Sequence, residues 1–181
     1  MPRLPALDPA AFTPEQQRVY AEIAAAHTGN VRGPWAIGLR VPEVADYSHK
    51  LYERLARDSK LGQRLYELIV LVVARHWKAQ FAWQTHEKNA LTAGVAQAAI
   101  DAIRERRTPE FDFEDERIAY DVVTELSTSR QLSDASYERA QAFFGDELLV
   151  ELISVAGLYT MIAMLLNAFD APIPAGTRRL E

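Results

Sequence analysis

The chain has 181 residues, of which 49% are hydrophobic and 25% are charged, as expected for one soluble globular domain with a sizeable core. The formal net charge is −5 and the isoelectric point is about 5.4, which argues against binding to nucleic acid or to an anionic membrane surface. The sequence contains no cysteine, and this excludes disulfides, thiolate metal sites and thiol peroxidase chemistry.

The hydrophobic pattern predicts helices throughout the chain. Thr13, Pro14 and Gln16 supply an N-cap, a proline at the first helical position and a reciprocal capping partner. The expected helices cover about 14–27, a segment that begins at Pro42, about 61–77, a segment that carries Trp83 and His86 and ends at Gly94, and about 95–105, 114–128, 134–144 and 146–169.

Three segments between or after these helices are expected to be irregular. Residues 29–39 contain glycine, asparagine and proline, residues 106–113 are charged and contain a proline, and the tail from Ala171 reads as extended. The run from Leu68 to Ala74 is rich in β-branched residues and, taken alone, also fits a buried strand. We favour a helix because the pattern continues well beyond strand length on both sides.

The N-terminal residues, MPRLPALDP, do not form the uninterrupted apolar stretch of a secretory signal. The longest apolar run, Leu68 to Ala74, is far shorter than the roughly 20 residues that span a bilayer. We therefore expect a cytoplasmic protein without a membrane span.

Glu67 and His86 are the candidate catalytic pair. A bend near Lys78 would fold the helix that carries His86 back across the preceding helix and bring the imidazole to the Glu67 carboxylate. Such a neighbour raises the proton affinity of a histidine and fixes its tautomer, which suits acid–base catalysis. The alternative is a hydrogen-bonded core histidine without a catalytic role, and it is the commoner situation for a single histidine on an apolar helix.

Three further side chains are candidates for substrate binding. Trp83 lies almost one helical turn before His86, so both residues can line one cavity. Arg75 can bind a substrate carboxylate through two hydrogen bonds, or it can be a solvated or inter-subunit charge. His76 is either a second proton donor at the mouth of the pocket or a cation that interacts with the helix dipole.

Searches for other chemistries find no glycine-rich phosphate loop, no His-Glu-x-x-His sequence, no clustered metal ligands and no Gly-x-Ser-x-Gly turn. We therefore predict no metal site. His27 and His49 lie among residues typical of surfaces, and we assign them no role.

The order Glu67, Trp83, His86 resembles the core motif of the carboxymuconolactone decarboxylase and alkylhydroperoxidase D-like superfamily. In the redox branch, two cysteines lie seven and four residues before the histidine, where this chain has Ala79 and Ala82. The resemblance implies that these two positions border the substrate site and that the proton relay is kept without redox sulfur.

The resemblance also implies an all-α, alkylhydroperoxidase D-like helical bundle. We expect a single domain over residues 1–181, with an N-terminal helix and loop at 1–34 and a core at 35–175. Members form homo-oligomers, commonly trimers or hexamers, and the strongly apolar helices of this chain, including 148–169, also favour self-association.

A weak internal repeat fits a degenerate two-fold repeat of a helical hairpin. Glu67-Leu-Ile and Glu151-Leu-Ile open similar apolar runs. The second copy has Asn167 and Asp170 where the first has Trp83 and His86, so any chemistry is expected in the first copy.

Decarboxylase members act on 4-carboxymuconolactone without a cofactor, because the unsaturated lactone accepts the electron pair as carbon dioxide leaves. By resemblance, His86 is the general acid and Glu67 orients it. Such members often read Glu-Tyr-Glu-Trp where this chain reads Gln80-Phe81-Ala82-Trp83, which implies a more apolar pocket. The sequence therefore indicates a decarboxylase-like lyase for a small carboxylated lactone or a related intermediate of aromatic catabolism.

Two alternatives stay open. The chain can be a non-catalytic helical binding module that kept the fold and lost the chemistry. Family membership alone would suggest peroxidase activity, against which the absence of cysteine argues.

Overall fold

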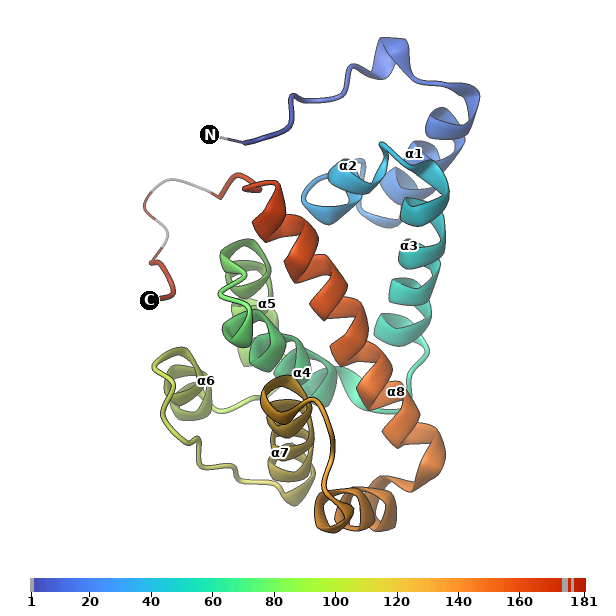
Figure 1. The fold of residues 1–181 in the computed structure, drawn as a ribbon. Helices are drawn as coiled ribbons and strands as arrows, with labels where there is room; N and C mark the ends of the chain where they lie inside the picture. Colours follow the sequence, from blue (N-terminus) through green and yellow to red (C-terminus); the bar gives the residue numbers. More distant parts are fainter. Residues whose placement is uncertain (1, 174–175, 177) are drawn as a thin grey trace.

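The computed structural model describes residues 2–173, 176 and 178–181. Within these residues all regular secondary structure is helical, as predicted (Figure 1). The elements are η1 (Pro9–Ala11), α1 (Pro14–Ala26), α2 (Pro34–Gly38), α3 (Pro42–Arg57), α4 (Gly62–His76), α5 (Gln80–Thr92), α6 (Gln97–Arg104), α7 (Glu114–Ser129) and α8 (Asp134–Ala168).

Helix α4 is the centre of the bundle and packs against α5, α6, α7 and α8. Every residue from Leu65 to Arg75 is buried, including the β-branched run that is compatible with a strand. A helix that is covered on all sides can be apolar all round, which is why this segment shows no polar face.

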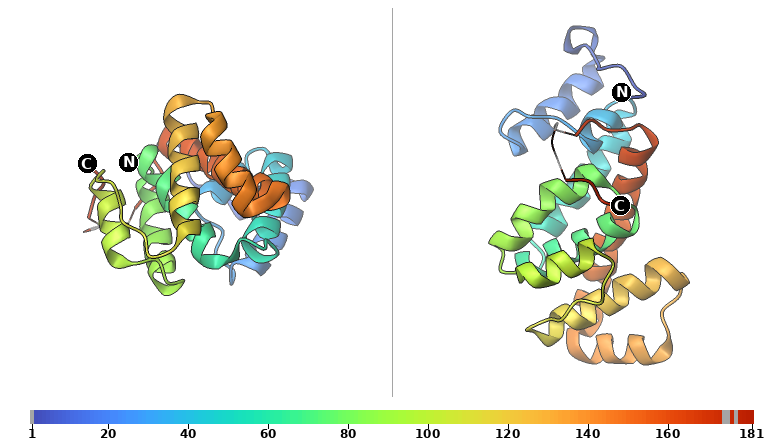
Figure 2. Two further views of the ribbon diagram at one scale, coloured as in Figure 1. Left: turned by 90° about the horizontal axis from the view of Figure 1, so that it is seen from below. Right: turned by 90° about the vertical axis from the view of Figure 1, so that its left-hand side faces the viewer.

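Helix α8 consists of two arms that meet at Gly145, where φ is 69° (Figures 1 and 2). Glycine tolerates this left-handed conformation, and the break falls between the two predicted helices at 134–144 and 146–169. The second arm crosses the bundle and packs on α2, α3 and α4. By length and composition it is apolar enough to cross a membrane, with a mean hydropathy of 2.1, although part of it is buried in the core.

Single polar residues divide this arm of α8, so it contains no uninterrupted apolar run as long as Leu68 to Ala74. Core helices of soluble proteins pass the same test of length and composition, so the arm is weak evidence for a membrane location.

The start of α1 follows the sequence prediction. Gln16 N donates to Thr13 Oγ1 and Thr13 N donates to Gln16 Oε1, which is a complete capping box. The predicted loop at 29–39 is partly wrong, because Pro34–Gly38 forms the short helix α2, with Pro34 at its first position.

A bend between α4 and α5 positions the candidate site. Lys78 takes a left-handed conformation with φ of 50°, and Ala79 N donates to Ala74 O at 2.8 Å. Helix α5 then returns along α4. Glu67 lies about three turns before the bend and His86 about two turns after it, so the two side chains reach similar levels of the bundle.

Segments near both ends of the chain cover one end of the bundle. Arg3 donates from its backbone N–H to Phe169 O and from Nη1 to Ala168 O. Leu180 N donates to Gln80 Oε1, which holds part of the tail against α5. Residues 171–173 are non-helical, as predicted, and the rest of the predicted extended tail includes 174 and 175, which lie outside the described residues.

Candidate functional site

The predicted contact between Glu67 and His86 is present. His86 Nδ1 lies 2.7 Å from Glu67 Oε2, and Gln63 Nε2 donates to the other carboxylate oxygen at 2.8 Å. The Glu67 side chain is 2% exposed and that of His86 is 13% exposed. A carboxylate only accepts hydrogen bonds, so we assign the Nδ1 proton to His86, which leaves Nε2 as an acceptor in the neutral imidazole.

Two buried tyrosines extend this contact into a chain. The Tyr159 hydroxyl lies 3.2 Å from His86 Nε2, and the Tyr66 hydroxyl lies 3.0 Å from that of Tyr159. With Nε2 as acceptor, Tyr159 donates to His86 and Tyr66 donates to Tyr159. Burial raises the pKa of both phenols, so both remain protonated donors at neutral pH.

His86 and Tyr159 open onto a cavity of about 130 Å³ between α5, α8 and the region around α2. This volume is smaller than the roughly 300–1,000 Å³ of typical sites for drug-sized ligands, so a small ligand is required. The lining residues are His27, Arg32, Pro34, Trp35, Tyr52, Phe81, Ala82, Thr85, His86, Asn89, Tyr159, Ile162 and Leu166.

Arg32 is the only cationic Lys or Arg side chain in this lining, and it is exposed. Among the described residues, no carboxylate lies within ion-pair distance of its guanidinium. An arginine without such a partner can bind a ligand carboxylate through two hydrogen bonds. The cavity therefore combines one cation with an imidazole and phenol donors on otherwise apolar walls.

Trp83, Ala79 and Ala82 do not all face this cavity. Ala82 lines it, whereas Ala79 is fully buried and does not. The prediction that Trp83 shares a cavity with His86 is wrong. Trp83 is 1% exposed, its Nε1 donates to Glu87 Oε2, and it packs in the core on another side of α5.

Arg75 and His76 are also outside the cavity, which corrects their predicted place beside His86. They lie at the far end of α4, about 12 Å along the helix from Glu67. Arg75 is buried and donates to Arg104 O at 2.6 Å and to Glu181 O at 2.7 Å. Both residues line a different cavity, of about 460 Å³, next to α7.

His27 and His49 are not isolated surface residues, contrary to the sequence analysis. His49 is 4% exposed, and its Nε2 lies 3.0 Å from Nε2 of His27, which lines the same cavity as His86. Burial lowers the pKa of both imidazoles. The polar neighbours of His27 and His49 in sequence concealed this contact, because it forms between α1 and α3.

Tyr159 and Arg32 are site residues that sequence reasoning missed. Tyr159 follows Glu151 by two turns of α8, and only the packing of α8 on α4 brings its hydroxyl to His86. The available signal was a tyrosine within a long apolar run, since a buried phenol usually has a hydrogen-bond partner. Arg32 gave no signal, because it lies in a segment without periodicity.

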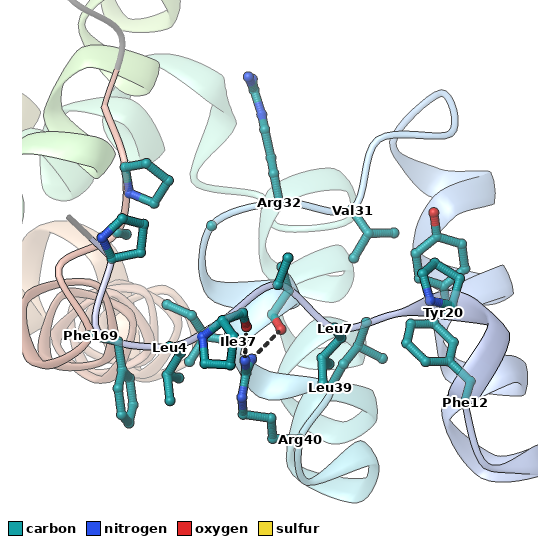
Figure 3. A pocket seen from close by; sticks show the side chains of 18 residues that line it. Leu4, Leu7, Phe12, Tyr20, Val31, Arg32, Ile37, Leu39, Arg40 and Phe169 are labelled. Atoms are coloured by element: carbon teal, nitrogen blue, oxygen red, sulfur yellow. Dashed lines mark hydrogen bonds between the residues drawn. The ribbon is translucent and has the colours of Figure 1, made fainter.

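A second, larger cavity of about 390 Å³ lies beneath the N-terminal segment (Figure 3). Its lining is mainly apolar and includes Leu7, Phe12 and Phe169, while Arg40 donates to the carbonyl oxygens of Pro5 and Ala36. No histidine or carboxylate is among the described residues that line it, so it lacks an acid–base group for neutral pH. The smaller cavity is therefore the better candidate for catalysis.

The residues that the structure describes contain no cluster of three or more histidine and carboxylate side chains arranged to hold a metal ion. The fold and the Glu67–His86 contact define a class of protein: an all-α bundle with a sulfur-free acid–base pair between two antiparallel helices. The model of the carboxymuconolactone decarboxylase family matches residues 42–125, a range that includes both Glu67 and His86. Over these residues the chain is therefore similar to the carboxymuconolactone decarboxylase family, and it contains no cysteine.

Solved structures of other proteins show the same fold. An uncharacterized peroxidase-related protein from Silicibacter sp. TM1040 is 20% identical, with a TM-score of 0.76 over 96% of this chain and 92% of that one. The debrominase Bmp8, as a C82A variant in complex with 2,3,4-tribromopyrrole, is 18% identical, with a TM-score of 0.73 over 94% and 90%.

A third structure, the alkylhydroperoxidase AhpD core of an uncharacterized peroxidase-related protein from Ralstonia eutropha JMP134, is 14% identical. Its TM-score is 0.68, and the match covers 96% of this chain and 93% of that one. At these identities the comparisons establish the fold. No curated protein matches the sequence.

Proposed function

We propose that the protein is a cofactor-independent lyase of the carboxymuconolactone decarboxylase type, which acts on a small carboxylated lactone or a related intermediate of aromatic catabolism. The observation that carries this proposal is the chain of hydrogen bonds Glu67–His86–Tyr159–Tyr66, which meets a cavity of about 130 Å³. A buried acid–base pair beside a small cavity is the arrangement that proton transfer to a bound substrate requires.

The reaction consists of two steps. The bond between carbon and the carboxylate breaks, carbon dioxide leaves, and the electron pair moves into the unsaturated lactone to give a dienolate. His86, held at Nδ1 by Glu67, takes up a proton at Nε2 and then places it on carbon. Once Nε2 of His86 carries this proton it donates to the Tyr159 oxygen, and the Tyr159 hydroxyl then donates to the dienolate oxygen while that charge develops, which a protonated, buried phenol does well.

Arg32 is the residue we propose for binding a substrate carboxylate. It lines the cavity, whereas Arg75, the sequence candidate, is hydrogen-bonded to two carbonyl oxygens at the other end of α4. The complex of Bmp8 with a brominated pyrrole supports a small ring compound as a ligand for this fold. The mostly apolar walls favour a ligand with few charges.

The test compares the turnover of the His86→Gln variant with that of the His76→Gln variant. Turnover is measured as carbon dioxide release from 4-carboxymuconolactone and related lactone acids. We expect His86→Gln to lower kcat by about 10²–10⁴-fold, the usual contribution of a general acid. Replacement of His76, which lies outside this cavity, should keep kcat within about twofold of the value for the unmodified protein. An His86→Gln protein that keeps its helicity and its rate would refute the proposal.

The second candidate function is ligand binding without chemistry, and the apolar cavity beneath the N-terminal segment favours it (Figure 3). At about 390 Å³ it falls within the size range of small-molecule sites. A lactone or an aromatic acid that raises the melting temperature of the protein without forming product would support this function over the lyase.

We also propose that the protein is a self-associating cytoplasmic protein, as a trimer or hexamer. Adjacent helices α3 and α8 leave large apolar side chains exposed, and burial against further copies of the chain would remove them from water. These side chains are Val44, Tyr47 and Leu51 on α3, and Tyr137, Phe143, Val150, Ile153 and Met164 on α8. Analytical ultracentrifugation at micromolar concentration should detect the oligomer, and a monomer would contradict it.

A further inference from the structure

The wall of the small cavity away from α5 carries a second pair of titratable groups. His27 stands at the C-terminal end of α1 and His49 within α3, and their Nε2 atoms are 3.0 Å apart. Trp35 and Tyr52 enclose the pair, with the Trp35 and His49 rings 5.0 Å apart and the His27 and Tyr52 rings 5.6 Å apart. His27, Trp35 and Tyr52 all line the cavity that His86 lines.

The contact between the two Nε2 atoms limits the pair to one extra proton. At 3.0 Å one nitrogen donates and the other accepts, so a single hydrogen lies between them. A proton added to the neutral pair goes to a free Nδ1, and the shared hydrogen stays in place. A second added proton would put two hydrogens between the facing nitrogens. The pair therefore acts as an acceptor of one proton.

Burial of the pair favours its neutral form while the cavity holds no ligand charge. Burial is the largest cause of the lowered pKa of both histidines, and Arg57 lowers both further. Glu53 acts in the opposite direction on both, Arg32 lowers the pKa of His27, and Asp46 raises that of His49. A carboxylate ligand in the cavity would add a negative charge close to His27 and so favour the protonated pair.

Decarboxylation needs a proton from outside the substrate. The carboxylate that is lost and one proton are converted into a C–H bond and carbon dioxide, so each turnover consumes one proton. On the side of His86, the hydrogen-bond chain runs from Tyr66 to Glu67, which are each 2% exposed, and only the amide of the exposed Gln63 donates to Glu67. An amide hydrogen bond does not supply a proton to a carboxylate. Neither Tyr66 nor Glu67 contacts bulk water directly. The opposite wall of the cavity contains the other proton acceptor, which is the His27–His49 pair.

We propose that His27 and His49 form the second acid–base group of this cavity, which takes up one proton when a small carboxylate binds and replaces the proton that His86 places on carbon. The last part rests on the proposed lyase function, whereas the uptake of the proton on binding does not. The negative charge of the carboxylate that is lost is thus matched by one proton on the pair, and both charges disappear when carbon dioxide leaves and the C–H bond forms.

Proton uptake on binding is measured by isothermal titration calorimetry with benzoate, in two buffers of different ionisation enthalpy at neutral pH. For the unmodified protein we expect uptake that approaches one proton per benzoate. Benzamide, which has nearly the same shape but no charge, should cause none. His49→Gln should lose the uptake and keep benzoate binding, and the control His76→Gln should match the unmodified protein.

His86→Gln separates the two walls in the same experiment, because His86 is the other histidine that faces the ligand. The proposal requires that this variant still takes up the proton. Loss of uptake in His86→Gln with retention in His49→Gln would overturn it, and so would a failure of benzoate to bind at millimolar concentration.

Nuclear magnetic resonance titration of the ring nitrogens gives a test without any ligand. His27 and His49 should titrate together, below the usual histidine range, and His49→Gln should uncouple His27 from that transition. Independent titration of the two rings at ordinary pH would contradict the shared proton. A protein that takes up the proton with benzoate but releases no carbon dioxide from any lactone acid would refute the lyase and leave this inference intact.

Discussion

Glu67 and Glu151 occupy equivalent places in two similar apolar helices, yet their surroundings differ. The Glu67 side chain is 2% exposed and contacts His86, whereas that of Glu151 is 16% exposed and pairs with Arg54 at 2.6 Å. After α4 the chain bends at Lys78 and returns as α5, which carries the histidine. Helix α8 has no such bend after Glu151 and continues to Ala168. The returning helix, rather than the carboxylate, is therefore what creates the candidate site.

The largest effect in this comparison is expected from removal of the two carboxylates in turn. Glu67→Gln removes the negative charge that stabilises a protonated His86, so kcat for the lactone acid should fall by about 10²-fold or more. Glu151→Gln makes the same chemical change in the other apolar helix and should keep kcat within about twofold of the value for the unmodified protein. Steady-state kinetics of both variants test this, and equal losses would show that Glu67 acts through stability alone.

The next effect concerns Tyr159, which connects the two apolar helices. Tyr159→Phe keeps the ring against His86 but removes the hydroxyl that bonds to His86 and Tyr66. Loss of a donor to a developing oxyanion should lower kcat by about 10–10²-fold, with a smaller change in KM.

Tyr66→Phe is the matched control, because it removes only the outer hydroxyl of the same chain. It should affect kcat less than Tyr159→Phe does. Since each variant leaves one buried hydroxyl or acceptor without its partner, denaturant unfolding of both should show a loss of about 1–3 kcal/mol. If the two substitutions reduce kcat equally, Tyr159 has no special contact with the reacting atoms.

The sequence predicted the fold and the Glu67–His86 contact because both depend on local signals. Helical periodicity, caps and the break near Lys78 are properties of neighbouring residues. Trp83 was placed wrongly because residues 83 and 86 share a helix face only approximately, and the indole turned instead to Glu87. Arg75 was assigned to the wrong cavity because it lies about 12 Å along α4 from Glu67, too far to share its site.

The remaining site residues depend on contacts between distant helices. Tyr159 reaches His86 across 73 positions, and His27 reaches His49 across 22. Neither contact follows from spacing within one helix. A single sequence therefore indicated one wall of the cavity, and the packing of α1, α3 and α8 was needed to find the others.

The smallest effect concerns the stability that Glu151 contributes at different pH. The hydrogen bond from Ser59, followed by that from Arg54, lowers the pKa of the Glu151 carboxyl in the folded protein. A lowered folded-state pKa favours folding at pH above the unfolded value of about 4.3. This contribution disappears as the pH falls through the folded-state pKa.

Unfolding by urea at pH 7 and again near pH 3 compares the unmodified protein with Glu151→Gln. The difference in unfolding free energy should be below about 1 kcal/mol at pH 7, as for most exposed ion pairs, and should shrink at the lower pH because a protonated glutamic acid resembles glutamine. A difference that is independent of pH would mean that Glu151 stabilises the fold by packing rather than by its charge. Glu151 and Glu67 would then differ mainly in that Glu67 contacts a histidine.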